Sequence, residues 1–340
     1  MKKILSMVLA LTLLLVSFAG CGDNSGSSAG TASGQSSAVS GTSGTSDGEP
    51  LKIGVLAPAV THGWISGVAH YAEARCEELK GGKDGKAPIE YRFLTCSNAE
   101  EMTTNLDNLK TWGAQAIVAY PQWEGMEVPI QQAIDEGIKV VNFDIEIDAD
   151  GVYRVSGDNE DMGIQSAQYI VDKIGKSGTV VVLNVPSAGS VSELREKGFM
   201  DKIKEIAPDM DIQTFPTQFN REAGLKDFTD ILTKLDHIDA VYSMDDETSI
   251  GVLNAIKEAN RTDIKVVTGG GGSQEYFKMM PENKDIWIQS ALYSPTMVMD
   301  AVDMAYDLLT GEEAEQVKII PTTIVDRDNY QDFLDESSPY

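Results

Sequence analysis

Residues 51–57 read LKIGVLA, a short apolar run that predicts a strand buried on both faces, as in a parallel sheet. The segment that follows has helical periodicity, and its apolar face carries Ile65, Val68, Ala72, Cys76 and Leu79. A buried strand followed by an amphipathic helix is the start of a βαβ unit, whose crossover is right-handed. This stretch therefore predicts an α/β fold built on a doubly wound parallel sheet.

The same alternation of strand and helix continues along the chain in two series. The first series has further strands predicted at residues 89–95, 114–120 and 139–144. The second has strands predicted at residues 179–184, 211–215, 240–244, 265–268 and 286–292. Each series is long enough to bury its own core, so we expect two α/β lobes. Ligands of such sheets bind beyond the carboxyl ends of the strands, so the residues after each strand are the candidates for a site.

The N-terminus has the layout of a bacterial secretory signal. A positive Met1-Lys-Lys3 precedes an apolar run that ends in Phe18-Ala-Gly-Cys21, which resembles the lipobox of lipoproteins. We predict a lipoprotein signal peptide at residues 1–20, lipidation of Cys21, and a location on the extracytoplasmic face of the bacterial cell membrane. An ordinary signal peptide with a chance cysteine is the alternative. Residues 21–49, rich in Gly and Ser, are expected to form a disordered tether.

Charge and cysteine content narrow the choice of partners. A formal net charge of −26 over 340 residues argues against nucleic acid as a partner. Beyond Cys21 the only cysteines are Cys76, on a predicted helix face, and Cys96, at the end of a predicted strand. The rise per residue of the two elements separates these thiols by roughly 15 Å, so we expect no disulfide.

Five further segments carry a resemblance to a known family. They are Lys139-Val-Val-Asn-Phe-Asp144, Ser156-Gly-Asp-Asn159, Leu194-Arg-Glu-Lys-Gly-Phe199, Phe219-Asn-Arg-Glu-Ala-Gly-Leu225 and Ala240-Val-Tyr-Ser-Met-Asp-Asp-Glu247. In their order and spacing, behind a lipoprotein-like signal, they resemble the type I periplasmic-binding family, and its ribose- and galactose-binding group in particular. The resemblance extends from Leu51 to about Asp328.

The resemblance implies a solute-binding protein of a bacterial ABC importer. Two lobes joined by three crossing strands would trap a ligand when the hinge closes, and the crossings would fall near Gly157, Ser294 and Thr323. The N-terminal lobe is then expected at residues 50–157 plus 294–322, and the C-terminal lobe at residues 158–293 plus 323–340. We expect a monomer that captures a monosaccharide or polyol and delivers it to an ABC permease.

The charged site candidates follow from the same resemblance. Asp144 falls where the family places a carboxylate that takes two sugar hydroxyls, and Arg195 where it has a ligand-gripping arginine of the second lobe. A helix-capping aspartate and a surface arginine are the alternatives. Both side chains are expected to face water in the open form. Asp245 matches a ligand-facing position, and because three adjacent carboxylates cannot all bind ligand, Asp246 or Glu247 is expected to cap the next helix.

Aromatic candidates would supply flat faces for a sugar ring. Trp64 and His62 match a ring-stacking aromatic and a polar contact of the family, with core packing and an exposed loop as their alternatives. Four more aromatic residues follow predicted strands at the cleft edge, although packing alone also explains each of them: Tyr120, Trp123, Phe219 and Tyr293.

Gly269-Gly-Gly-Gly272 departs from the family, because ribose-binding relatives have an aromatic residue and a ligand-binding aspartate there. A larger ligand, or one met by backbone amides, would fit the vacated room, so Gly270 joins the candidates. The run lacks the spacing of a phosphate loop, and a flexible turn at the cleft is the favoured interpretation.

The stretch from Glu146 to Gly151 resembles a calcium-binding loop, but its twelfth position is Gly157, where such a loop has a glutamate. We therefore expect a solvated acidic connection there. We predict no metal and no cofactor.

Two rival functions fit the sequence less well, and a third stays open. An enzyme would show a nucleophile elbow, a metal-ligand spacing or a dinucleotide fingerprint, and the three histidines are scattered. Sugar-responsive repressors share this core, but they carry a DNA-reading headpiece where this chain has a signal and a tether. A ligand-presenting accessory protein of a membrane sensor or chemoreceptor, binding a furanose-like signal or a nucleoside, stays open.

Overall fold

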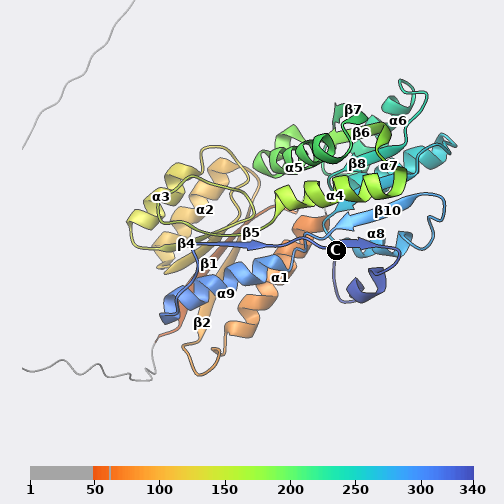
Figure 1. Ribbon diagram of the computed structural model, residues 1–340. Helices are drawn as coiled ribbons and strands as arrows, with labels where there is room; N and C mark the ends of the chain where they lie inside the picture. Colours follow the sequence, from red (N-terminus) through yellow and green to blue (C-terminus); the bar gives the residue numbers. More distant parts are fainter. Residues whose placement is uncertain (1–48, 61–62) are drawn as a thin grey trace, which may run out of the picture. The chain divides into compact units, whose positions relative to one another are not determined.

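The computed structural model describes residues 49–60 and 63–340. The predicted signal peptide, Cys21, His62 and nearly all of the predicted tether lie outside the described residues. Strands and helices alternate along the described chain (Figure 1). The elements are β1 (Leu51–Pro58), α1 (Gly63–Leu79), β2 (Ile89–Cys96), α2 (Ala99–Trp112), β3 (Ala116–Ala119), α3 (Glu127–Asp135), β4 (Lys139–Phe143), β5 (Tyr153–Gly157), α4 (Asn159–Ile174), β6 (Ser177–Asn184), α5 (Ser190–Ile206), β7 (Asp209–Pro216), α6 (Arg221–Leu232), β8 (Ala240–Ser243), α7 (Asp246–Glu258), β9 (Val266–Gly270), α8 (Gln274–Met279), β10 (Trp287–Ala291), α9 (Met297–Thr310), β11 (Val317–Ile320) and β12 (Ile324–Asp326).

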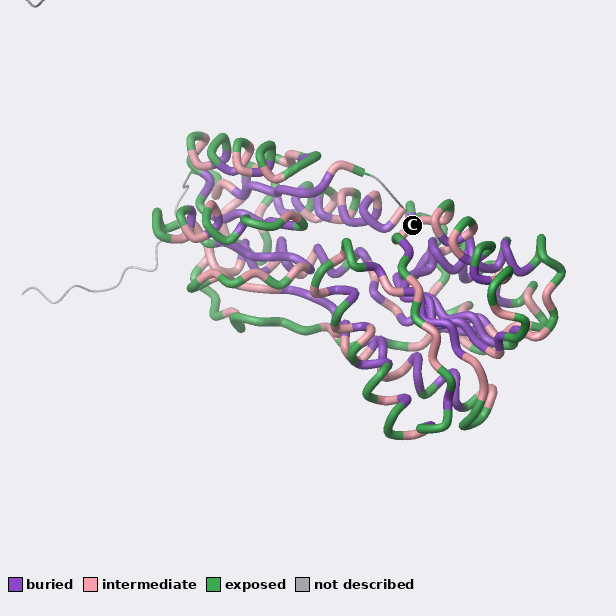
Figure 2. Tube along the Cα trace, turned by 90° about the horizontal axis from the view of Figure 1, so that it is seen from above, coloured by how far each residue is buried: buried purple, intermediate pink, exposed green. Residues whose placement is uncertain are grey.

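The first lobe is built on a six-stranded sheet in the order β11-β5-β4-β3-β1-β2, and every neighbouring pair is parallel. Side chains of β1 alternate between its two faces, as a strand requires. Ile53 and Val55 pack in a core with α1 and α9, whereas Leu56 packs on the other face with α2 and α3. The inner strands β1, β3, β4 and β5 are buried over most of their length, as expected for a parallel sheet covered by helices on both faces, whereas the edge strands β2 and β11 are more exposed (Figure 2).

The second lobe has a sheet in the order β12-β10-β9-β8-β6-β7. Val181 and Leu183 of β6 face a core with α6, α7 and α8, and Val180 and Val182 face a core with α4 and α5. The predicted fold class, two lobes with parallel α/β sheets, is confirmed. One strand differs, because β12 pairs with β10 in the antiparallel direction. It arrives directly from β11 of the first sheet, without the long crossover that a parallel neighbour needs.

The chain passes between the sheets three times, after β5, after β10 and between β11 and β12. Backbone hydrogen bonds join these crossings to one another. Asp158 N–H donates to the Ile320 carbonyl at 2.9 Å, and Leu292 N–H donates to the Thr323 carbonyl at 2.8 Å. The crossings therefore lie side by side as one connection between the lobes.

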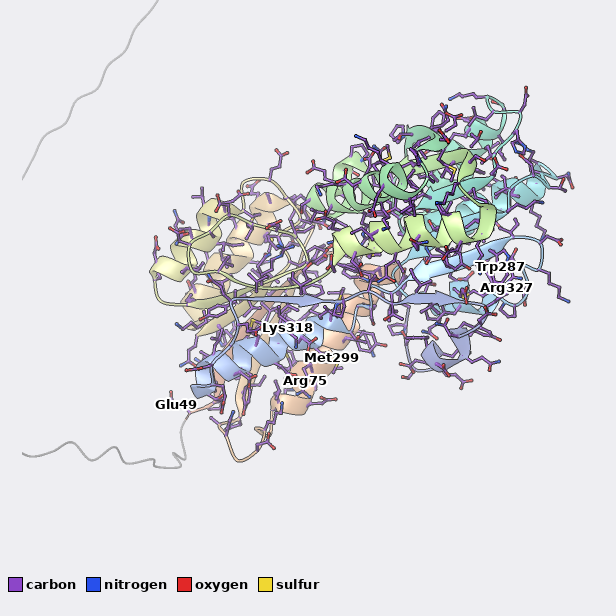
Figure 3. The ribbon with its side chains drawn as sticks, viewed as in Figure 1. Glu49, Arg75, Trp287, Met299, Lys318 and Arg327 are labelled. Carbon is purple, nitrogen blue, oxygen red and sulfur yellow. The ribbon has the colours of Figure 1, made fainter. Side chains whose placement is uncertain are left out.

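Side-chain contacts hold the outer strand of the second sheet in place. The Trp287 ring of β10 lies between the Lys173 ammonium, 3.5 Å from its centroid, and the Arg327 guanidinium, 3.9 Å from it. Trp287 and Arg327 are neighbours at the far end of this lobe (Figure 3). Arg327 also donates to the Asn283 and Ile286 carbonyls, each at 2.7 Å. The segment after β12 is thus fastened to β10 by a cation–π contact and hydrogen bonds.

Cys76 and Cys96 are both buried free thiols. Cys76 packs in the core of the first lobe between the sheet and α1, and Cys96 packs on the opposite face. Among the described helices, none is long and apolar enough to cross a membrane.

Candidate functional site

The carboxyl ends of both sheets border one cleft, with a volume of about 700 Å³. Such a volume suits a small organic ligand. Residues of both lobes line it, as the rule for doubly wound sheets predicts. The cleft brings together the nine predicted ligand residues that the structure describes: Trp64, Tyr120, Trp123, Asp144, Arg195, Phe219, Asp245, Gly270 and Tyr293.

Trp64, in the first turn of α1, lies in a cluster of aromatic rings. Its ring is stacked on Phe143 with 6.2 Å between centroids and 7° between planes, and the Tyr120 ring meets it edge-on at 6.1 Å. Its indole N–H donates to the Tyr293 carbonyl at 2.7 Å. Trp64 is only 9% exposed and also lines the cleft. The residue therefore packs in the core and forms part of the cleft wall.

Asp144 follows β4 in a left-handed backbone conformation, with φ at 68°. Asp and Asn adopt this region more readily than other non-glycine residues. Its carboxylate accepts a hydrogen bond from the Tyr293 hydroxyl. Burial raises the pKa of Asp144, and the hydroxyls of Tyr293 and Tyr120 and the charge of Arg195 oppose this shift. Asp144 does not cap a helix, because the strand β5 is the next element.

Arg195, on α5, reaches the cleft because α4 and α5 approach unusually closely. A Cβ on Gly163 would collide with the Arg195 carbonyl, and a Cβ on Gly198 would collide with the Glu160 carbonyl. The Arg195 guanidinium donates from Nε to Asn159 Oδ1 and from Nη1 to the Met244 carbonyl, each at 2.8 Å. The third guanidinium nitrogen of Arg195, Nη2, is not used in these two hydrogen bonds.

The Arg195 guanidinium also lies over aromatic rings, 4.7 Å from the Tyr293 centroid and 5.7 Å from that of Phe219. Arg195 is 5% exposed and Asp144 is 3% exposed. Both side chains are thus buried in this structure, and the expectation that they face water in the open form stays a prediction. Neighbouring side chains of the protein itself surround them and satisfy part of their hydrogen-bonding capacity.

The three adjacent carboxylates after β8 have three different roles. Asp245 caps α7, because its extended backbone precedes the helix and its side chain accepts from the Thr248 N–H at 3.2 Å. The expectation that Asp246 or Glu247 supplies the cap is wrong, since both already lie in the first helical turn. Glu247 instead accepts two hydrogen bonds from one edge of the Arg221 guanidinium, from Nε at 2.5 Å and from Nη2 at 3.1 Å.

Asp246 does not line the cleft, and its carboxylate forms hydrogen bonds that hold the Gly269–Gly272 run in place. One of its carboxylate oxygens accepts from the N–H groups of Gly272 and Ser273 at 2.9 and 2.8 Å, and from the Ser290 hydroxyl at 2.9 Å. Burial raises the pKa of Asp246 to about 6, and burial together with the charge of Asp246 raises that of Asp245 to about 7. Gly270 ends β9, and the turn after it is held by the hydrogen bonds to Asp246. The turn expected to be flexible is therefore held in place by a side chain.

The charge of the cleft is strongly one-sided. Glu146, expected in a solvated connection, lines the cleft and pairs with Arg154 at 3.1 Å. Five carboxylates line the cleft against one cation, Arg195, among the described residues: Glu124, Glu127, Asp144, Glu146 and Asp245. These groups do not converge on one point, and no cluster of described residues has the makeup of a metal site.

Several lining residues were not predicted. Residues 185–191, which run from the end of β6 into the first turn of α5, form one edge of the cleft, and Gln218 and Asn220 flank Phe219. Because they follow strands of the second sheet, the position rule that selected Asp245 also points to them. Tyr340 lines the cleft as well, and it follows no strand of either sheet, so no local signal marks it.

A family model described as a periplasmic binding protein domain matches residues 53–313. The chain is similar to the D-allose-binding periplasmic protein of Escherichia coli K12, with 30% identity over 162 residues, 45% of this chain and 52% of that protein. The match therefore spans about half of that relative. The chain is also similar to the xylitol-binding protein of Mycolicibacterium smegmatis, with 24% identity over 261 residues, 74% of each chain.

Among solved structures, the chain is similar to an ABC transporter periplasmic solute binding protein from Actinobacillus succinogenes with bound D-allose. The TM-score is 0.74 at 20% identity, over 84% of this chain and 100% of that one. At this level of identity the likeness concerns the fold, and it agrees with the two-lobe architecture described above.

Proposed function

The chain belongs to the periplasmic binding protein domain family, and from this membership we propose that it is an extracytoplasmic solute-binding lipoprotein that delivers a small ligand to an ABC importer. The ligand is a monosaccharide or polyol, held in the cleft between the lobes. Relatives named for D-allose and xylitol support this ligand class. The role is capture and release, and it includes no catalytic step.

The observation that carries the ligand class is the chemistry of the cleft. Within the part of the cleft that the structure describes, five carboxylates against one guanidinium disfavour an anionic ligand such as a sugar phosphate. Carboxylates and a guanidinium bind pairs of hydroxyl groups well, because each forms two hydrogen bonds in a fixed geometry. The aromatic side chains of the cleft offer faces for the C–H surfaces of a sugar ring. A neutral, hydroxyl-rich ligand uses both features.

The lobes are proposed to move as units about the three crossings. The boundaries then stand at residues 50–157 plus 294–322 for one lobe and 158–293 plus 323–340 for the other. A ligand favours the closed arrangement only through its higher affinity for that state, so contacts from both lobes are needed. Asp144 of the first lobe and Arg195 of the second are proposed to supply them.

A thermal-shift panel followed by calorimetry tests the ligand class. The purified folded part, residues 49–340, is measured with D-allose, ribose, xylitol and myo-inositol, and with a sugar phosphate as the anionic control. We expect at least one neutral compound to raise the melting temperature and to give a saturable heat of binding. Binding of the sugar phosphate alone, or of none of the five, contradicts the proposal.

The lipid anchor and the delivery step need separate tests. Wild-type protein is expected in the membrane fraction of the cell, because two acyl chains anchor stably where one does not. Cys21→Ser is expected in the soluble fraction, and an equal membrane fraction for both contradicts the anchor. Deletion of the gene is expected to abolish uptake of the labelled ligand. Normal uptake with loss of a transcriptional response would favour the sensor alternative instead.

A further inference from the structure

Tyr340 is a buried residue at the end of an exposed stretch of chain. Residues 334–337 and Pro339 are exposed, whereas Tyr340 is 6% exposed and packs in the same core cluster as Trp64 and Tyr293. It is also one of the residues that line the cleft. The end of the chain lies where the two lobes meet (Figures 1 and 2). An exposed segment therefore delivers one aromatic ring into the candidate site.

Glycines of both lobes make the room for this ring. A Cβ on Gly271, in the second lobe, would stand 2.6 Å from the Tyr340 hydroxyl oxygen. A Cβ on Gly63 of α1, in the first lobe, would stand 2.9 Å from its Cδ2 atom, and one on Gly67 would stand 3.3 Å from its Cβ. Any side chain at Gly271 would displace the ring. The glycine run thus leaves a space that this chain fills from its own C-terminal segment.

Residues of α8 hold the start of this segment on the second lobe, where the Phe333 ring meets the Phe277 ring edge-on with 6.5 Å between centroids. Gln274 of α8 donates from Nε2 to the Phe333 carbonyl at 3.1 Å and accepts from the Asp335 N–H at 2.7 Å. A turn follows, in which Ser338 Oγ accepts from the Tyr340 N–H at 3.3 Å and donates to the Tyr340 carbonyl at 2.9 Å. The anchor lies on one lobe and the ring contacts the helix α1 of the other.

We propose that Tyr340 is a ligand-site residue, which supplies an aromatic face and a hydroxyl where the Gly269–Gly272 turn presents no side chain. The inference rests on the proposed function and deepens it, because it assigns part of the sugar or polyol specificity to the C-terminal segment. Burial and the nearby carboxylates of Asp246 and Asp245 raise the pKa of Tyr340, so the phenol stays protonated and can donate to a ligand oxygen.

Calorimetry on single variants measures the contribution of the ring and of the hydroxyl separately. The probes are D-allose, ribose, xylitol and myo-inositol. Tyr340→Ala is expected to weaken the best-bound probe by about tenfold or more, and Tyr340→Phe by less, because it keeps the ring. Leu334→Ala is the matched control, since Leu334 is an exposed apolar residue of the same segment that does not line the cleft. It is expected to bind like wild type.

A thermal double-mutant cycle without ligand tests where the ring sits. Gly271→Ala strains the backbone in any background, since Gly271 has φ at 129°. In the wild-type background it also meets the Tyr340 hydroxyl, so it should lower the melting temperature more there than in Tyr340→Phe. Equal losses in the two backgrounds contradict the placement of the ring.

The two proposals fail in different ways. If wild type binds a probe and folded Tyr340→Ala binds it equally well, the role of Tyr340 is wrong and the proposed function stands. If wild type binds none of the four probes, both are wrong. Weaker binding in Leu334→Ala to the same extent as in Tyr340→Ala also contradicts the inference, because the effect would then belong to the segment as a whole.

Discussion

The hydroxyl of Tyr293 donates a hydrogen bond to the Asp144 carboxylate. Tyr293 belongs to the crossing after β10, and Asp144 ends β4 of the first lobe. The same hydroxyl accepts from Asn159 Nδ2 at 3.3 Å, and Asn159 Oδ1 accepts from Arg195 Nε at 2.8 Å. The two proposed charged ligand contacts, one from each lobe, are therefore joined by a hydrogen-bonded chain through the hinge.

The first prediction concerns the charge of Asp144. Asp144→Asn keeps the shape of the side chain and tolerates the left-handed backbone, but it removes the charge. We expect sugar affinity to fall about tenfold or more, since hydrogen bonds to charged groups contribute about 1.5 to 3 kcal/mol. The melting temperature should change little, because the amide oxygen of asparagine can still accept the hydrogen bond from the Tyr293 hydroxyl. Calorimetry on folded protein decides this, with Asp148→Asn, an exposed neighbour outside the cleft, as control.

The second prediction concerns Arg195. Arg195→Met leaves Asn159 Oδ1 and the Met244 carbonyl without their donor. We expect a loss of about 1 to 3 kcal/mol in the free energy of unfolding for each unsatisfied acceptor, together with weaker sugar binding. Urea denaturation measures the first effect and calorimetry the second. Lys204→Met, on the exposed face of the same helix, is the control. An unfolding free energy equal to that of wild type would show that these bonds contribute nothing.

The third prediction separates the two roles of Trp64. Trp64→Phe keeps an aromatic face against Phe143 but leaves the buried Tyr293 carbonyl without its indole donor. We expect about 1 to 3 kcal/mol lower stability in urea and only a modest loss of affinity. Trp64→Ala should lower stability by about 3 to 5 kcal/mol and weaken binding further. If the two variants bind the sugar equally, the ring does not contact it.

The fourth prediction concerns the dependence of stability on pH. The pKa values of Asp245 and Asp246, about 7 and about 6, lie above their ordinary value of 3.8. The folded chain thus binds these protons more tightly than the unfolded chain does. Their contribution to stability is complete below about pH 4 and is lost as the pH rises through about 6 to 7. We therefore expect these groups to lower the melting temperature between about pH 5 and about pH 8.

Asp245→Asn isolates this effect, because asparagine still caps α7 at Thr248 but cannot ionise. The fall in melting temperature should be smaller in this variant than in wild type, and the variant should be the more stable of the two at about pH 8. Glu336→Gln, which removes an exposed carboxylate, should follow wild type. A fall of the same size in Asp245→Asn and in wild type would contradict the prediction.

Local patterns were sufficient for the fold class and for most of the cleft. The periodicity of LKIGVLA and of the helix after it reports which faces are buried, and burial is what decides strand and helix in a parallel α/β lobe. Since the carboxyl ends of parallel strands meet at one edge, positions such as Asp144 and Asp245 could be placed at the cleft from strand order alone. The strands β5, β11 and β12 were not predicted, because YRVSG of β5 contains no apolar run, β11 is mostly exposed and β12 has only three residues.

What the sequence by itself determined, then, is the two-lobe scaffold and the set of side chains that follow its strands. Only the tertiary structure decided how those side chains are used. Asp245 caps α7 while Asp246 fastens the glycine turn, and Tyr340 enters the cleft from a distant segment. The physical reason is that periodicity reports only which face of an element is buried. The role of Asp245 depends on the residue at which α7 begins, and those of Asp246 and Tyr340 depend on contacts with residues far away in the sequence.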